Sequence, residues 1–276
     1  MKISNLKRII SVVVLLSLCL PLAACGKKKD ETVELNAYEK TIPAAVSPSS
    51  GVGRKDIKPD MQQQAPTGHT IVVDAGHGFM DGGCGEGVYE DGTLEKDINF
   101  AVASLLADRL KLLGYTVIMT HDGENLPAAD TNNNRIFSAT ERVVYVNSLK
   151  DVDYLISIHV NSFDDSSVSG MHIYYQQSSV KVNDWGKTIT EDIADAIHDE
   201  AGEPRPLVKD GTDPYTSFAL TREVTIASTL LEIGFASNPS DAEKMVDDEW
   251  RETLANSIAS GIDRFFKELD GVADVK

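Results

Sequence analysis

The spacing of apolar residues predicts alternating strands and helices from residue 69 to the end of the chain. Apolar runs of strand length occur at residues 69–75, 115–120, 153–160, 170–176, 217–221 and 228–235. The helical period of apolar residues predicts helices at residues 95–114, 138–149, 182–201 and 247–269. The two clearest stripes consist of Ile98, Val102, Leu105, Leu106, Leu110 and Leu113, and of Leu254, Ile258, Ile262 and Phe265.

This alternation predicts one α/β domain over residues 69–270, followed by a short tail at 271–276. Strands that alternate with helices favour a mostly parallel, twisted sheet with helices on both faces. About two hundred residues are enough for one domain with a sizeable core. In such sheets the reactive side chains gather beyond the carboxyl ends of the strands, so we expect the chemistry there.

The first 25 residues resemble the export signal of a bacterial lipoprotein. Lys2, Lys7 and Arg8 precede an apolar run at residues 9–23, and "LAAC" ends at Cys25. The run is short and interrupted for a membrane span, although an uncleaved signal anchor is the alternative. This pattern predicts an exported protein that is anchored to a bacterial membrane by a lipid on Cys25, with its domain facing the cell wall or periplasm.

Residues 26–68 predict a disordered tether between the lipid and the domain. The segment holds four of the ten prolines and few large apolar residues. It therefore cannot bury enough apolar surface to offset the entropy of ordering.

The net charge and the cysteine content limit which binding partners and which cysteine roles we expect for this protein. The formal net charge of −17 disfavours nucleic acid and anionic lipid surfaces, which leaves the lipid on Cys25 as the expected membrane contact. Of the three cysteines, Cys19 lies in the signal and Cys25 would carry the lipid, so Cys84 has no disulfide partner. A metal ligand or a nucleophile is conceivable at Cys84, but a small buried side chain is the favoured interpretation.

The glycine-rich stretch "VVDAGHGFMDGGCGEG" at residues 72–87 permits more than one interpretation. A phosphate-binding loop needs a lysine followed by serine or threonine, and neither occurs there. A dinucleotide-binding fingerprint needs a third glycine where Asp81 stands. These missing positions disfavour a nucleotide and leave a buried histidine or a metal site.

Four side chains near strand ends are candidates for a metal centre. His77, His159 and Glu232 follow or end predicted strands, and Glu95 begins a predicted helix. Two histidines and one carboxylate make a zinc triad with a position open for water, and a second glutamate can serve as general base. The alternatives are a buried histidine bonded to backbone for His159 and a carboxylate that favours a helix start for Glu95. Glu232 lies in an apolar strand, where an unpaired carboxylate is costly.

Four motifs together resemble the zinc-dependent N-acetylmuramoyl-L-alanine amidases of the type-3 amidase family, over about residues 70–268. They are "VVDAGHG", "EKDINFAVA", "SIHVNS" and "LLEIGFASNPSD", in this order. The resemblance implies the fold of zinc amidases and zinc exopeptidases, Zn²⁺ ligands at His77, Glu95 and His159, and a catalytic Glu232. Two positions depart from the family pattern, because Phe79 replaces a glycine and "TIAST" lacks a proline before the last strand.

The resemblance also implies a substrate and two supporting residues. The substrate is peptidoglycan, cut at the amide between N-acetylmuramic acid and L-alanine of the stem peptide. Arg142 matches a helix arginine to which we assign a structural role, and Asn161 is predicted to orient His159. A zinc peptidase and a non-catalytic wall-binding module are the alternative functions, and whether a protein activator is required is left open.

Overall fold

The computed structural model describes residues 63–84, 92–125, 135–175, 185–211 and 216–271. The expected signal, Cys25 and nearly all of the expected tether lie outside these residues. The elements follow in the order β1 (Thr70–Ala75), α1 (Glu95–Leu112), β2 (Thr116–Met119), α2 (Ala139–Ser148), β3 (Tyr154–Asn161), β4 (His172–Tyr175), α3 (Trp185–Ala201), β5 (Leu207–Lys209), α4 (Ala219–Arg222), β6 (Ala227–Phe235), α5 (Pro239–Met245) and α6 (Asp248–Leu269).

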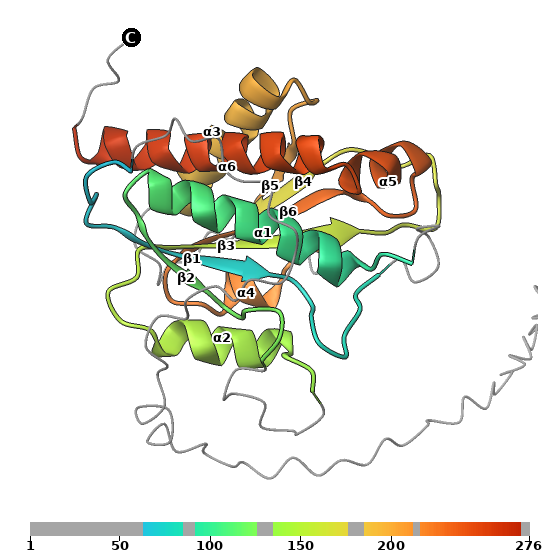
Figure 1. Ribbon diagram of the computed structural model, residues 1–276, viewed down its shortest axis with the longest axis horizontal. Helices are drawn as coiled ribbons and strands as arrows, with labels where there is room; N and C mark the ends of the chain where they lie inside the picture. Colours follow the sequence, from blue (N-terminus) through green and yellow to red (C-terminus); the bar gives the residue numbers. More distant parts are fainter. Residues whose placement is uncertain (1–62, 85–91, 126–134, 176–184, 212–215, 272–276) are drawn as a thin grey trace, which may run out of the picture. The chain divides into compact units, whose positions relative to one another are not determined.

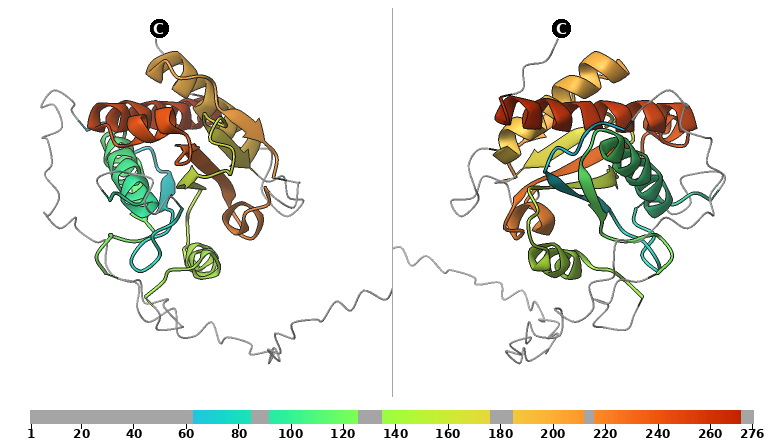
Figure 2. Two further views of the ribbon diagram at one scale, coloured as in Figure 1. Left: turned by 90° about the vertical axis from the view of Figure 1, so that its right-hand side faces the viewer. Right: turned by 60° about the vertical axis from the view of Figure 1, so that its left-hand side comes forward.

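The six strands form one sheet in the order β2-β1-β3-β6-β4-β5. Neighbouring strands are parallel except β4 and β6, which are antiparallel. Helices α1, α3 and α6 lie on one side of the sheet, and α2 and α4 lie on the other (Figures 1 and 2). The predicted fold, a mostly parallel sheet between helices, is therefore confirmed.

The larger core lies between the sheet and helices α1, α3 and α6. Ile98, Val102 and Leu106 of α1 pack there with Ile258 and Ile262 of α6. Full burial of one such side chain contributes about 1.5–3 kcal/mol. A smaller cluster on the other face contains Val72, Leu155, Val143 and Leu220 and seats α2 and α4. The predicted stripes are buried, except that Leu105 is 36% exposed.

The expectation of a strand at residues 217–221 was wrong. Phe218 is the N-cap of α4, and the hydroxyl of Thr221 donates a hydrogen bond to the Phe218 carbonyl. A short apolar run is not long enough for its spacing to distinguish a strand from one turn of helix. In α4, only Leu220 and Thr221 are buried. Strand β5 and helix α5 are short elements that the apolar pattern did not predict.

In the part of the chain that the structure describes, no helix is long and apolar enough to cross a membrane.

Candidate metal centre and active site

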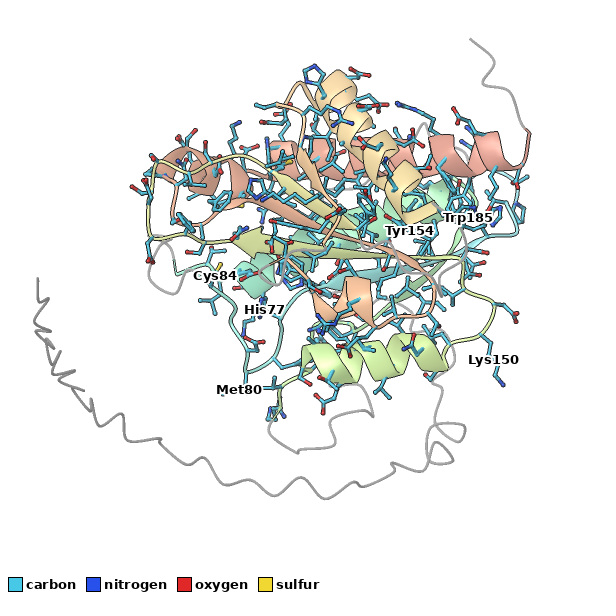
Figure 3. The ribbon with its side chains drawn as sticks, turned by 180° about the vertical axis from the view of Figure 1, so that it is seen from behind. His77, Met80, Cys84, Lys150, Tyr154 and Trp185 are labelled. Atoms are coloured by element: carbon cyan, nitrogen blue, oxygen red, sulfur yellow. The ribbon has the colours of Figure 1, made fainter. Side chains whose placement is uncertain are left out.

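Three side chains predicted as metal ligands meet at one end of the sheet. His77 follows β1, His159 lies near the end of β3, and Glu95 is the first residue of α1. Their ligand atoms all lie within 4.8 Å of one another. Glu95 Oε1 lies 3.3 Å from His77 Nε2 and 3.4 Å from His159 Nδ1. Figure 3 shows His77 and Cys84 at this end of the sheet, with Met80 farther out.

The turn after β1 brings the two histidines together. His77 has φ 62°, in the left-handed region that few non-glycine residues adopt. A Cβ at Gly76 would lie 2.3 Å from Cε1 of His159, so a glycine is required for the ring of His159 to lie over this backbone. The rings of His77 and His159 are 5.1 Å apart and nearly perpendicular, which leaves nitrogens of both directed at Glu95.

Glu95 is held by three donors from three different segments. The amide of Cys84 donates to Oε2 at 2.6 Å, and the amide of Val160 and the side chain of Asn99 donate to Oε1 at 3.0 and 3.1 Å. Burial opposes the charge on Glu95, yet hydrogen bonds and attraction from His159 and His77 hold its pKa well below the usual range. The carboxylate is therefore ionised and fixed in position.

Asp81 fixes the other side of His77. Its Oδ2 lies 2.9 Å from His77 Nδ1, and its Oδ1 accepts from the amide of Gly83 at 3.1 Å. Burial lowers the pKa of His77, but hydrogen bonds and attraction from the carboxylates of Glu95 and Asp81 outweigh it and raise that pKa to about 9. Because Asp81 accepts from Nδ1, Nε2 is the nitrogen left to bind a metal.

Glu232 lies on β6 beside His159, its register partner on β3. The residue is 6% exposed, and its Oε2 has no hydrogen-bond partner among the described residues. Burial and the neighbouring charge of Glu95 raise its pKa to about 7, while His159 and His77 oppose the increase. A carboxyl group that can take up and release a proton near neutral pH therefore lies next to the three candidate ligands.

Arg142 connects α2 to the strand and turn that carry His77. Its guanidinium donates to Asp74 Oδ1 at 2.5 Å, to the carbonyl of Ala75 at 2.8 Å, and to the carbonyl of His77. Asp74 in turn accepts from Thr120 and Ser157. This buried network supports the structural role predicted for Arg142.

Among the described residues, Asn161 forms no hydrogen bond with His159. Its side chain accepts a hydrogen bond from the amide of Ser162 at 2.8 Å, and its carbonyl accepts from the amide of Ala236 at 2.7 Å. The second of these hydrogen bonds joins the ends of β3 and β6, where the strand register shifts.

Cys84 lies beside the site without joining the ligand cluster. Its thiol donates to the carbonyl of Val160 at 3.0 Å, and burial together with the nearby Glu95 raises its pKa far above the usual range. The thiolate that a metal ligand or nucleophile requires is therefore disfavoured.

Among the described residues, Asp81 and Asn99 contact the candidate ligands and were missed by the sequence interpretation. Asp81 was considered only as the residue that interrupts a glycine pattern, although a carboxylate four residues after a loop histidine can reach its ring. Asn99 lies one helical turn after Glu95, a spacing that could have identified it.

The residues present fit a zinc ion. Two imidazoles and one carboxylate are the donor set of many catalytic zinc sites, which keep one position open. The partner of His77 Nδ1 and the donors to Glu95 hold the ligands in place before a metal binds.

The sequence and the fold both match known proteins. The chain matches the Amidase_3 family, N-acetylmuramoyl-L-alanine amidase, over residues 71–264. The germination-specific N-acetylmuramoyl-L-alanine amidase of Bacillus subtilis (strain 168) is 30% identical over 207 residues, which cover 73% of this chain and 81% of that protein. The CwlD amidase of Clostridioides difficile, solved in complex with the GerS lipoprotein, has a TM-score of 0.60 and 25% identity and covers 72% of this chain and 99% of its own.

A second solved structure, the catalytic domain of CwlV from Bacillus (Paenibacillus) polymyxa var. colistinus, has a TM-score of 0.58 and 26% identity. It covers 74% of this chain and 99% of its own. The chain therefore belongs to the Amidase_3 family of N-acetylmuramoyl-L-alanine amidases. The cell wall amidase activity expected from the four motifs is confirmed at the level of the family.

Proposed function

We propose that this amidase depends on zinc held by His77, Glu95 and His159, and that Glu232 is its catalytic residue. One observation carries the proposal. The ligand atoms of the first three residues lie within 4.8 Å of one another, and Glu232, a buried carboxyl group whose Oε2 lacks a partner among the described residues, adjoins His159.

The role of each residue in amide hydrolysis follows from whether its side chain binds the metal or holds a proton. A zinc ion bound to the three ligands supplies Lewis-acid chemistry for the scissile carbonyl and acidifies water. Glu232 takes the proton of the attacking water and returns it to the nitrogen of the leaving amine. Asp81 holds the proton on His77 Nδ1 throughout, and the three donors to Glu95 keep that ligand ionised.

The bond that the enzyme cleaves in this proposal is the amide between N-acetylmuramic acid and L-alanine of the peptidoglycan stem peptide. The family match and the relative from Bacillus subtilis, whose names describe this bond, support it. Digestion of purified peptidoglycan by the full chain, with added zinc or with a chelator, tests it by mass analysis of the soluble products. Stem peptides that begin with L-alanine should appear only with zinc. Cleavage within the stem would contradict the proposal and indicate a peptidase, and zinc-independent release would contradict the metal assignment.

The location of the enzyme is a separate part of the proposal. The signal at residues 1–25 and the tether at residues 26–68 support export and attachment to a bacterial membrane by a lipid on Cys25, with the domain facing the cell wall or periplasm. In cells that express the full chain, labelled fatty acid should enter the wild-type protein and not Cys25→Ser. Equal label in both proteins would contradict lipidation at this cysteine.

A further inference from the structure

Glu232 has a register partner on each side of β6. On β3 the partner is His159, a candidate metal ligand, and on the antiparallel strand β4 it is His172. Side chains that lie directly opposite each other in neighbouring strands project from the same face of the sheet. His172 therefore borders the catalytic carboxyl group on the side away from the candidate metal centre.

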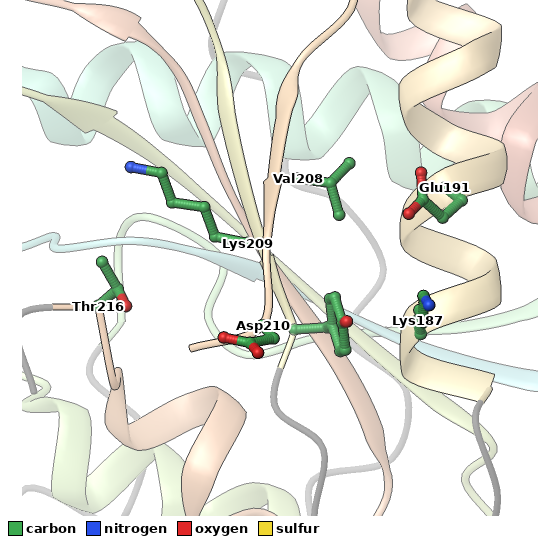
Figure 4. A pocket seen from close by; sticks show the side chains of 7 residues that line it. Lys187, Glu191, Val208, Lys209, Asp210 and Thr216 are labelled. Carbon is green, nitrogen blue, oxygen red and sulfur yellow. The ribbon is translucent and has the colours of Figure 1, made fainter. Parts of the chain in front are cut away.

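The same face continues to the edge strand β5 with a lysine. Lys209 is the register partner of Tyr174, two residues after His172. Lys209 Nζ lies 3.5 Å from His172 Nδ1 and 5.4 Å from the centre of the Tyr174 ring. Figure 4 shows Lys209 and Val208 on opposite sides of β5, and Val208 packs against the larger core. Lys209 thus projects from the face that carries Glu232.

The hydrogen bonds among His172, Tyr174 and Lys209 leave hydrogen-bond donors available to a ligand. A lysine ammonium only donates, and the Tyr174 hydroxyl lies 3.2 Å from the same nitrogen, so Nδ1 of His172 is the acceptor. Nε2 of a neutral His172 then carries a hydrogen and can donate. Burial and the charge of Lys209 lower the pKa of His172, which agrees with the neutral ring.

In the part of the chain that the structure describes, the ammonium of Lys209 forms no ion pair with an acid. Among the described residues, no carboxylate oxygen lies within 4.0 Å of Lys209 Nζ, although the chain has a formal net charge of −17. Lys209 and His172 are both partly exposed, so a ligand can reach them. Donors from a cation and an imidazole together match a carboxylate.

We propose that His172 and Lys209 form a subsite that binds a carboxylate of the peptidoglycan stem peptide. This inference rests on the proposed function, because it places the scissile amide at Glu232. Neighbouring strands are about 4.8 Å apart, so the subsite extends roughly 5–10 Å from Glu232 along the sheet. An extended peptide covers that distance in about two to three residues. The subsite therefore selects an acidic group within the first residues beyond the cleaved bond.

The test measures binding of released stem peptides to the zinc-supplemented full chain by calorimetry. Two stem peptides are compared that differ at one carboxylate close to L-alanine, either a side-chain or an α-carboxylate. This carboxylate is free in one peptide and amidated in the other. Lys209→Met removes the charge and keeps the length of the side chain. Lys187→Met is the matched control, because Lys187 of α3 lines a pocket together with Lys209, and His172 is not among the residues that line it (Figure 4).

The wild-type chain should bind the free peptide about tenfold more tightly than the amidated one, as expected for a charge-assisted hydrogen bond. Lys209→Met should abolish that preference without weakening binding of the amidated peptide, and Lys187→Met should retain it. A preference that survives in Lys209→Met, or a wild-type chain with no preference, overturns the subsite. Release of stem peptides from peptidoglycan by the same preparation tests the proposed function separately.

Discussion

Asp81 Oδ2 lies 2.9 Å from Nδ1 of His77, on the side of the imidazole opposite to Glu95. Asp81 is itself fixed by the amide of Gly83 and by a pair of backbone hydrogen bonds with Gly78. The short turn after β1 thus carries both a candidate ligand and the carboxylate that sets its tautomer. Partners of this kind typically change metal affinity by 10–100-fold.

Asp81→Ala should therefore weaken zinc binding by about 10–100-fold without unfolding the domain. The reason is that the proton on Nδ1 loses its acceptor, and the ring loses its preferred orientation. Competition with a chromophoric chelator measures the affinity, and circular dichroism reports the fold. Asp164→Ala, at an exposed position on the loop after β3, is the matched control. Equal zinc affinity in Asp81→Ala and wild type would rule out this role.

The architecture could be predicted because the spacing of buried apolar residues determines where the main helices and strands form. The stripe of α6 and the apolar strand β6 have many contacts with the core, and these contacts are encoded in residue spacing. Helix α4 and strand β5 have four and three residues, respectively. Their conformations depend on packing against the rest of the sheet, which a local pattern does not contain.

For the candidate site, the four motifs predict His77, Glu95, His159 and Glu232, but not the hydrogen bonds that hold these side chains in place. The hydrogen bond from Asn99 to Glu95 and that between His77 and Asp81 depend on side-chain directions in the folded chain. The pairing of His172 with Glu232 depends on strand order, since β4 reaches β6 only as an antiparallel neighbour. Such relationships arise from tertiary structure and are not local signals.

Gly76→Ala should disrupt the metal centre through one methyl group. The added Cβ would lie 2.3–2.5 Å from three atoms of the His159 ring, so the ring must rotate away from Glu95. Zinc affinity should fall at least about tenfold, since a ligand is displaced. Gly186→Ala is the control, because the nearest heavy atom to its Cβ, outside the adjoining chain, would be the carbonyl oxygen of Ser228 at 3.7 Å. Zinc binding by Gly76→Ala at the level of Gly186→Ala would contradict the prediction.

Asp74→Asn should destabilise the protein most at neutral pH. Burial acts to raise the pKa of Asp74, but Arg142 and the hydroxyls of Ser157 and Thr120 hold it lowered to about 2. A carboxyl group with a depressed folded-state pKa stabilises the fold above its unfolded value of about 4, and this contribution, about 2 kcal/mol, is lost as the pH falls towards 2. The variant also leaves Arg142 without its buried partner, which costs about 3–5 kcal/mol at neutral pH.

Urea unfolding between pH 2 and 7 measures this difference. The gap in the free energy of unfolding between wild type and Asp74→Asn should be widest near pH 7 and narrow by about 2 kcal/mol below pH 4. Asp164→Asn provides the control for the loss of one exposed carboxylate. A gap that is constant over this range would show that Asp74 is not held ionised by Arg142.

Glu232→Gln should separate catalysis from zinc binding and from stability. The amide cannot take a proton from water, so turnover of peptidoglycan should fall by about 10²–10⁴-fold. Zinc content should be retained, because Glu232 does not belong to the ligand cluster. His159→Ala is the contrasting variant and should lose both zinc and turnover. Full activity in Glu232→Gln would exclude Glu232 as the catalytic base.

The stability of metal-free Glu232→Gln offers an independent measurement of the same side chain. Burial raises the folded-state pKa of Glu232 to about 7, so ionisation destabilises the wild type as the pH rises from about 4.5 through 7. Above pH 7 the variant should be more stable than wild type by roughly 2–4 kcal/mol, and the advantage should vanish below about pH 4. Urea unfolding at the two pH values tests this. A buried carboxylate that is kept unpaired for proton transfer lowers the stability of the fold, so its removal should raise stability. If Glu232→Gln were instead less stable than wild type at pH 8, the carboxylate would have a structural partner.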